Sequence, residues 1–156
     1  MPDLNLQIKN AVENQGFTLS EEAWNDISEI WEPVTFKRKT IISFQGQIEK
    51  HLYFVTEGVQ RVYYEDDGNR EATLVFSYPY SFTGVLDSFM LQSPSRYNFE
   101  TLTNSILLKT SYSQFQEETK KHPEFDAFTR TAINYVVHGL LERIVELQCF
   151  SSEEKI

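Results

Sequence analysis

The feature that most constrains this fold is a change of hydrophobic period along the chain. Between Val34 and Leu108 the apolar residues form short runs with a period of two, and turn-forming glycines interrupt them. Before and after this stretch they recur every three to four positions, as in amphipathic helices. Short strands with frequent turn residues are typical of sandwiches, jelly rolls and β-rolls. The sequence therefore predicts such a β-domain with helices at both ends.

Local signals place the first elements. A short amphipathic helix near the N-terminus ends at Gly16, which suits the C-terminal glycine position of a helix. Ser20 is a good N-cap for a second helix, and Pro33 stops it. Within the β stretch, Asp66-Asp67-Gly68-Asn69 gives the clearest hairpin signal.

The helical period returns after Lys109. Ser111 can cap a short helix, and Pro123 suits the first turn of a longer one that runs to about Phe150, roughly 40 Å at 1.5 Å per residue. This helix is apolar on more than one side, so it needs more than one packing partner. We expect one heptad-like stripe to meet the same helix of a second copy: Ile133, Val137, Leu140, Ile144 and Leu147. The alternative is one broad face packed within a monomer.

Composition limits the protein class. The 156 residues fit one domain, or one domain with an appended element. The net charge of -9 argues against a surface for a nucleic-acid backbone. No apolar run approaches the ~20 residues needed to cross a bilayer, and the N-terminus resembles no secretory signal. Cys149 is the single cysteine, which excludes an internal disulfide, so we expect a cytoplasmic protein.

One stretch, from Ser81 to Leu102, combines features of an anion site. A glycine turn at Gly84 leads into a short helix from Val85 to Leu91, and Arg96 lies where the chain re-enters a strand. Such a turn presents free backbone N–H groups, and the arginine adds a planar charged group, so together they can hold a phosphate. The alternative is a surface connection with Arg96 in solvent.

The order of these elements and several local motifs carry a family resemblance. The motifs are L-S-E-E-A-W-N-D-I, I-I-S-F-Q-G-Q, H-L-Y-F-V-T-E-G-V-Q-R-V, F-T-G-V-L-D-S-F, P-S-R-Y-N-F-E-T-L and H-P-E-F. From about Thr18 onwards the chain resembles the cyclic-nucleotide-binding domain of the Crp/Fnr family of transcription regulators. This implies an α+β fold: a double-stranded β-helix or jelly-roll-like β-roll with N-terminal helices and a long C-terminal dimerisation helix. The corresponding division is residues 1–122, 123–150 and 151–156, the last being the start of a linker.

The same resemblance implies the ligand-binding residues. Gly84 would open the cassette helix and Arg96 would grip a cyclic phosphate, with Val85, Leu86 and Tyr97 beside them. We also expect Arg96 to point inward, because it opens the strand that faces this helix. Two positions depart from the family: Val85 replaces a glutamate that accepts from the ribose hydroxyl, and Tyr97 replaces a small hydroxyl residue. The middle of the long helix, residues 138–141, is also largely apolar. A site without its polar partner loses much of its discrimination, so we expect a pocket that has diverged from cAMP binding.

The expected function is effector sensing in a Crp/Fnr-type transcription regulator, without catalytic activity. No cofactor is indicated with certainty, and a small anionic or nucleotide-like effector is the ligand class to expect. The partners expected are a second copy of the chain and, only through a C-terminal helix-turn-helix not present in this sequence, DNA. The alternative is a degenerate β-roll that acts only as a structural dimerisation module.

The histidines and the cysteine bear on two further classes of protein, metal-dependent oxygenases and haem sensors. A cupin-type metal oxygenase needs clustered histidine and carboxylate ligands, whereas His51, His122 and His138 lie far apart in the sequence. We therefore interpret them as surface or packing residues and expect no metal site. Cys149 is interpreted as a small core or interface residue. A haem sensor stays open within the family, although no ligand pair stands out.

Overall fold

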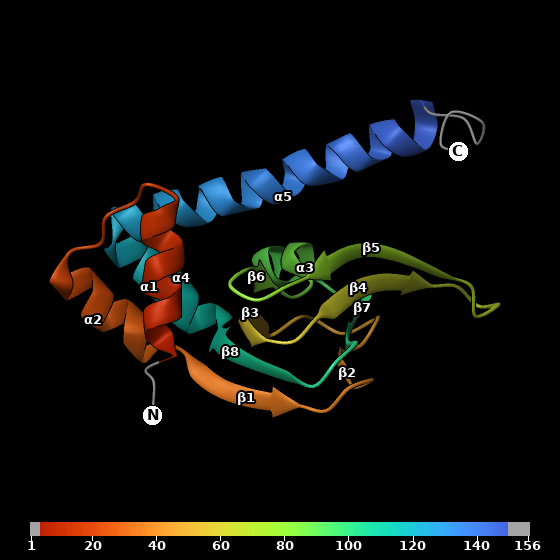
Figure 1. Ribbon diagram of the computed structural model, residues 1–156, viewed down its shortest axis with the longest axis horizontal. Helices are drawn as coiled ribbons and strands as arrows, with labels where there is room; N and C mark the ends of the chain where they lie inside the picture. The colour runs from red at the N-terminus through yellow and green to blue at the C-terminus, as the bar shows by residue number, and fades with distance from the viewer. Residues whose placement is uncertain (1–3, 150–156) are drawn as a thin grey trace.

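Two four-stranded antiparallel sheets form the body of the protein in the computed structural model, which describes residues 4–149 (Figure 1). The first sheet has the order β1 (Glu32–Phe36), β8 (Ser105–Ser111), β3 (His51–Glu57) and β6 (Phe82–Thr83). The second has the order β2 (Ile41–Ser43), β7 (Asn98–Thr101), β4 (Gln60–Glu65) and β5 (Glu71–Ser77). With helices before and after the sheets, the predicted α+β fold with a roll-like β-domain is confirmed.

Strand β3 is buried on both faces, which explains its continuous apolar run. Val55 packs with Phe99 and Leu107 in a cluster between the two sheets, and all three are fully buried. Phe54 and Leu108 face the other way, into a second cluster shared with the helices. Alternate residues of a strand point to opposite faces, so one strand supplies both halves of the core.

The helices gather at one end of the sheets (Figure 1). These are α1 (Asn5–Asn14), α2 (Glu21–Glu29), α4 (Tyr112–Lys121) and the first turns of α5 (Pro123–Cys149). The predicted caps form, since the amide of Ala23 donates to Ser20 Oγ at 3.1 Å and Ser111 makes a capping box with Gln114. Pro123 is the first residue of α5 as predicted, and the expected end at Phe150 lies outside the described residues.

The predicted hairpin joins β4 to β5. Asp66 Oδ1 accepts from the amides of Gly68 and Arg70 at 2.9 and 2.8 Å, which closes the turn.

The pairing of β4 with β5 is irregular beyond this hairpin. Val62 pairs with Val75 and Tyr63 with Thr73, so Leu74 is an extra residue in β5. This is a β-bulge. Arg143 of α5 reaches it and donates to the carbonyl oxygens of Leu74 and Thr73 at 3.0 and 3.1 Å.

The two halves of α5 differ in burial. Phe125 and Phe128 in the first half are 0% and 1% exposed, whereas every described residue from Val137 onwards is exposed. Figure 1 shows the second half extending over the sheets as a single long rod. None of the helices within residues 4–149 combines the length and apolar character needed to cross a membrane.

Candidate functional site

The expected anion-binding turn lies between β6 and the short helix α3 (Leu86–Leu91). Gly84 has a φ of +120°, a conformation that side chains disfavour. A Cβ placed there would also lie 3.4 Å from the His51 carbonyl oxygen and from the Tyr53 ring. A glycine is therefore required by the path of the chain at this turn.

Val85, the residue after the turn glycine, belongs to the core. It is 2% exposed and lies in the cluster between the sheets, with Tyr53 and Phe99. Its backbone N–H donates to Glu49 Oε2 at 3.3 Å. The valine side chain contributes packing here, and the amide expected to face an anion already has an acceptor from its own chain.

Glu49 is the functional candidate for which the sequence gives no signal. It lies in the connection between β2 and β3, and it is 3% exposed. Besides the Val85 amide, its carboxylate accepts from Ser43 Oγ at 2.6 Å and from the His51 amide at 3.4 Å. Burial raises the pKa of Glu49, and these donors oppose that shift. The turn therefore holds an internal carboxylate where an external anion was expected.

The side chain of Arg96 is exposed, so the expectation that it points inward is wrong. Within residues 4–149 it makes no hydrogen bond or ion pair, and none links it to the Gly84 turn. The preceding Ser95 fixes the backbone, because its hydroxyl donates to the Tyr97 carbonyl and accepts from the Tyr97 amide. This local loop directs the chain into β7 without burying Arg96. A role of Arg96 in binding a ligand stays a prediction.

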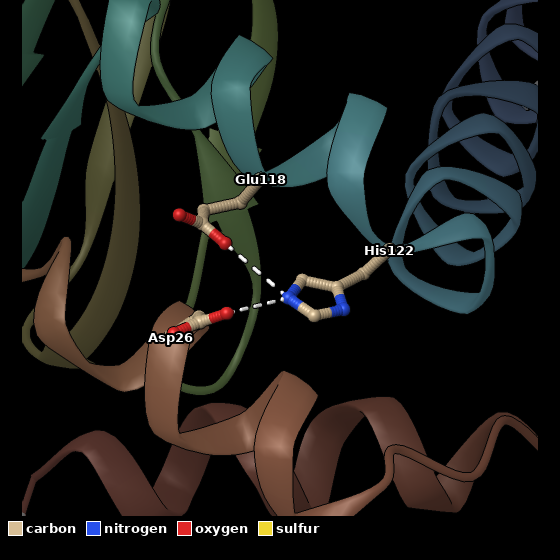
Figure 2. A group of neighbouring side chains, drawn as sticks. All are labelled: Asp26, Glu118 and His122. Carbon is tan, nitrogen blue, oxygen red and sulfur yellow. Dashed lines mark hydrogen bonds and ion pairs between the residues drawn. The ribbon is translucent and has the colours of Figure 1, made fainter.

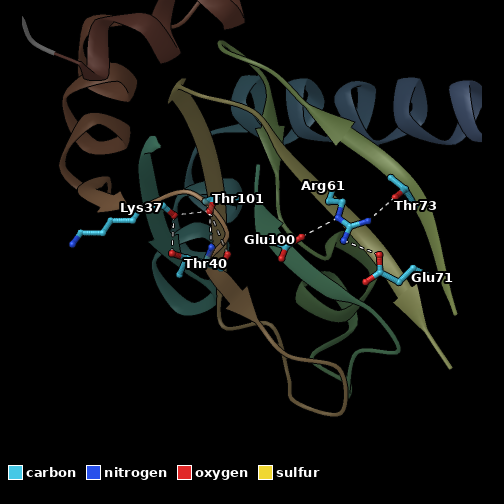
Figure 3. A network of polar contacts seen from close by, with 7 residues as sticks. All are labelled: Lys37, Thr40, Arg61, Glu71, Thr73, Glu100 and Thr101. Carbon is cyan, nitrogen blue, oxygen red and sulfur yellow. Dashed lines mark hydrogen bonds and ion pairs between the residues drawn. The ribbon is translucent and has the colours of Figure 1, made fainter. Parts of the chain in front are cut away.

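The arginine that is largely buried is Arg61 of β4, at 16% side-chain exposure (Figure 3). Its guanidinium donates to Glu100 of β7 and to Glu71 and Thr73 of β5, each at 3.0 Å, and it stacks over the Tyr63 ring. Because its donors are engaged on both neighbouring strands, Arg61 holds the second sheet together. Figure 3 also shows Thr101 Oγ1 donating to the Lys37 carbonyl oxygen; Thr101 follows Glu100 directly on β7.

Tyr97 and Leu86 are both half-buried. Tyr97 packs on the cluster between the sheets, whereas Leu86 packs on the helical cluster and lines a cavity of about 210 Å³. The cavity lies between α1, β6, α3 and α5, and its apolar lining includes Ala11, Phe82, Met90, Ala132 and Ile133. Two regions of the molecule thus adjoin α3: the polar turn around Glu49 and an apolar cavity under α5.

The five residues of the predicted stripe on α5 do not share one environment. Ile133 is half-buried and faces the cavity of its own chain, whereas Val137, Leu140, Ile144 and Leu147 are 47%, 36%, 48% and 61% exposed. The four exposed residues match the arrangement expected for a helix seam, and their assembly stays a prediction.

Comparison with known proteins places this geometry in a family. The family model for the cyclic nucleotide-binding domain matches residues 33–122, which include both sheets and the Gly84 turn. No curated protein matches the chain.

Several solved structures share the fold. A cyclic nucleotide-binding domain from Methylobacillus flagellatus KT has a TM-score of 0.73 at 11% identity, over 93% of this chain and 82% of that one. The catabolite activator protein of Thermus thermophilus has 0.69 at 18% identity, over 84% of this chain and 60% of that one. A CooA mutant from Carboxydothermus hydrogenoformans has 0.68 at 17% identity, over 88% and 86%.

The chain therefore spans less than two thirds of the Thermus thermophilus protein, and at these identities the likeness concerns the fold alone. The family model is more informative, since its match covers more than half of this sequence. This chain belongs to the cyclic nucleotide-binding domain family.

Proposed function

We propose that this chain is the effector-sensing domain of a Crp/Fnr-type transcription regulator, with a pocket that has diverged from cyclic-nucleotide binding. The observation that carries the proposal is the contact between the Glu49 carboxylate and the Val85 amide, 3.3 Å apart. A cyclic phosphate at this turn would have to displace that carboxylate or lie beside it, and two anions at such a distance repel strongly in a buried site. Val85 also offers no acceptor for a ribose hydroxyl.

If a cyclic phosphate is disfavoured at the turn, Arg96 indicates which other class of ligand the region can bind. Its guanidinium is exposed and makes no ion pair with the described residues, so it is available to a small anionic or nucleotide-like effector. Occupancy of the region beside α3 would act on α5, which lines the adjoining cavity through Ala132 and Ile133. In a dimer this would change how two α5 helices meet and would reposition any DNA-binding helix-turn-helix that follows them.

Titration calorimetry with cAMP and cGMP tests the divergence of the pocket. We expect no heat of binding at tens of micromolar. A Glu49→Gln variant removes the negative charge and retains an acceptor for Val85, so it should bind either nucleotide more tightly than the natural chain. Glu118→Gln, which neutralises a buried glutamate away from the turn, is the matched control. A saturable isotherm with the natural chain that Arg96→Ala abolishes would contradict the proposal.

The assembly proposed is a cytoplasmic homodimer through the second half of α5. The exposed stripe of Val137, Leu140, Ile144 and Leu147 is too apolar to suit a solvated helix face. Gly139 lies beside it, and no atom lies within 4 Å of where its Cβ would be, so two backbones have room to approach. Replacing Leu140 and Ile144 with glutamate should give monomers in light scattering, whereas Asn134→Glu on the same helix should leave the dimer intact. An unchanged dimer mass in the double variant would reject the seam.

The same contact also favours a second candidate, a structural dimerisation module that binds no ligand. Because the Val85 N–H already donates a hydrogen bond to the Glu49 carboxylate, this amide needs no effector as an acceptor. Mass spectrometry of a denatured extract of purified protein distinguishes the two. A small molecule retained by the purified protein supports the sensor. The structural module is supported if the dimer retains no small molecule and the Glu49→Gln variant gains no affinity for either nucleotide.

A further inference from the structure

Three side chains of metal-ligand type meet where α2 faces the junction of α4 and α5 (Figure 2). His122 Nε2 lies 2.9 Å from Asp26 Oδ2 and 3.5 Å from Glu118 Oε2. One potential ligand atom from each residue falls within 4.8 Å of the other two. Two ligands bound to one zinc ion at ~2.1 Å lie at most ~4.2 Å apart. Small side-chain rotations would therefore bring all three onto one ion.

Glu118 gives an independent reason to expect a ligand here. It is 7% exposed, and its Oε2 is buried without a hydrogen-bond partner in the described part of the chain. Figure 2 shows one carboxylate oxygen of Glu118 directed at the His122 imidazole, on the side where Asp26 lies. Burial raises the pKa of Glu118, and the negative charge of Asp26 adds to the shift. A buried carboxylate oxygen without a donor is costly, and a cation beside it would offset that cost.

We propose that Asp26, Glu118 and His122 bind one divalent transition-metal ion. One imidazole nitrogen and two carboxylate oxygens form a set that suits Zn²⁺ or Co²⁺, whereas Mg²⁺ and Ca²⁺ prefer oxygen ligands alone. Glu118 and His122 are four residues apart, so they project from the same face at the end of α4, and Asp26 closes the site from α2. The rest of the coordination sphere would be water.

Lys121 is the competitor of the metal ion. Its Nζ lies 3.0 Å from the same Asp26 oxygen that faces His122, and its side chain is 53% exposed. The ammonium can move into solvent when a dication takes its place, since exposed ion pairs are weak. Removal of this charge should therefore favour the metal ion, whereas in a purely structural ion-pair cluster it would only remove a contact.

The position of the site gives it a structural role. The His122 carbonyl oxygen accepts from the amides of Phe125 and Asp126 at 3.1 Å each, so His122 belongs to the first turn of α5 as well as to the end of α4. A metal ion would tie this junction to α2. It would thereby fix the direction in which α5 leaves the helical end of the protein, independently of the Gly84 turn.

Metal titration of the full chain, in a Cys149→Ser background that removes the exposed thiol, tests the proposal. We expect Co²⁺ to give saturable visible absorption bands at one ion per chain. Zn²⁺ at ~100 times its dissociation constant should raise the thermal midpoint by at least ~5 °C, and Mg²⁺ should not. Glu118→Gln and His122→Gln should each weaken Co²⁺ binding at least ~tenfold. Absence of saturable binding would overturn the proposal.

The chain offers a matched control and a variant that keeps every ligand. His138 and Glu142 have the same spacing of four residues and lie 3.1 Å apart, but both are exposed and no third ligand joins them in the described residues. His138→Gln should leave Co²⁺ affinity unchanged, and a loss in this variant alone would overturn the assignment. Lys121→Met should bind Co²⁺ more tightly than the background chain even if the buried variants fail to fold. Weaker binding in Lys121→Met would contradict the proposal.

Discussion

The Gly84 turn and the contact between α2 and α4 each bury one glutamate, and the chain treats the two side chains differently. Glu49 and Glu118 are 3% and 7% exposed, and burial raises the pKa of both. Glu49 accepts hydrogen bonds from a hydroxyl and two amides, whereas Glu118 Oε2 has no hydrogen-bond partner among the described residues. Burial alone therefore does not mark a binding site. A buried carboxylate that accepts hydrogen bonds from nearby donors is stabilised without a ligand, whereas one that lacks such donors can be stabilised by a cation.

The largest expected effect on the free energy of unfolding comes from replacing Glu49 with alanine, and the same replacement of Glu118 provides the comparison. Glu49→Ala leaves the Val85 amide and the Ser43 hydroxyl without their acceptor, so the free energy of unfolding should fall by about 2–3 kcal/mol. Among the described residues, Glu118→Ala removes no hydrogen bond and only the 3.5 Å ion pair with His122, so it should cost about 1 kcal/mol or less. Urea denaturation of both variants, without added metal and at one protein concentration, measures the difference. Equal losses would show that the hydrogen bonds of Glu49 contribute little.

An intermediate effect is expected at Ser43, which donates to Glu49 Oε2 at 2.6 Å. Ser43→Ala should lower the free energy of unfolding by about 1.5 kcal/mol, because hydrogen bonds to charged groups are stronger than neutral ones. It should also raise the pKa of Glu49 further, since this hydroxyl opposes the effect of burial. Ser28→Ala, which removes an exposed hydroxyl bonded to the Asn25 carbonyl, is the control and should change little. No difference between the two alanine variants would contradict the prediction.

The smallest expected effect is a pH dependence. Because the pKa of Glu49 is raised in the folded protein, its contribution to stability is fully present below the unfolded glutamate pKa of about 4.3 and is lost as the pH rises through the folded pKa. The glutamine of the Glu49→Gln variant does not titrate, so the variant should lack this part of the decrease in the free energy of unfolding with rising pH. Chemical denaturation of both proteins from acidic to neutral pH gives the comparison. Parallel profiles would mean that the pKa of Glu49 is the same in both states.

Much of the fold could be predicted because its signals are local. Ser20, Ser111 and Pro123 determine helix starts through their own geometry, and the Asp66 turn closes through bonds within four residues. The change of period between helices and strands is likewise visible in any short window. Each of these signals needs no knowledge of distant partners.

The candidate sites were less predictable because they join distant segments. Glu49 meets the Val85 amide 36 residues away, and His122 meets Asp26 96 residues away. Neither acidic residue differs in the sequence from an ordinary surface carboxylate. Arg96 was expected inside because it opens the strand that faces the short helix after Gly84, but its side chain is exposed. Which polar residues are buried depends on tertiary contacts that no local pattern encodes.

The contact of Arg143 with the bulge in β5 has a consequence for solubility. β5 is the outer strand of its sheet, and an outer strand with free carbonyl groups is a template for pairing with another chain. The bulge at Leu74 interrupts that template, and the guanidinium of Arg143 occupies two of its carbonyl oxygens. The nearby Phe76, at 45% exposure, would otherwise add an apolar side chain to an open strand edge. We therefore expect Arg143 to hinder the pairing of this strand with the edge of another chain.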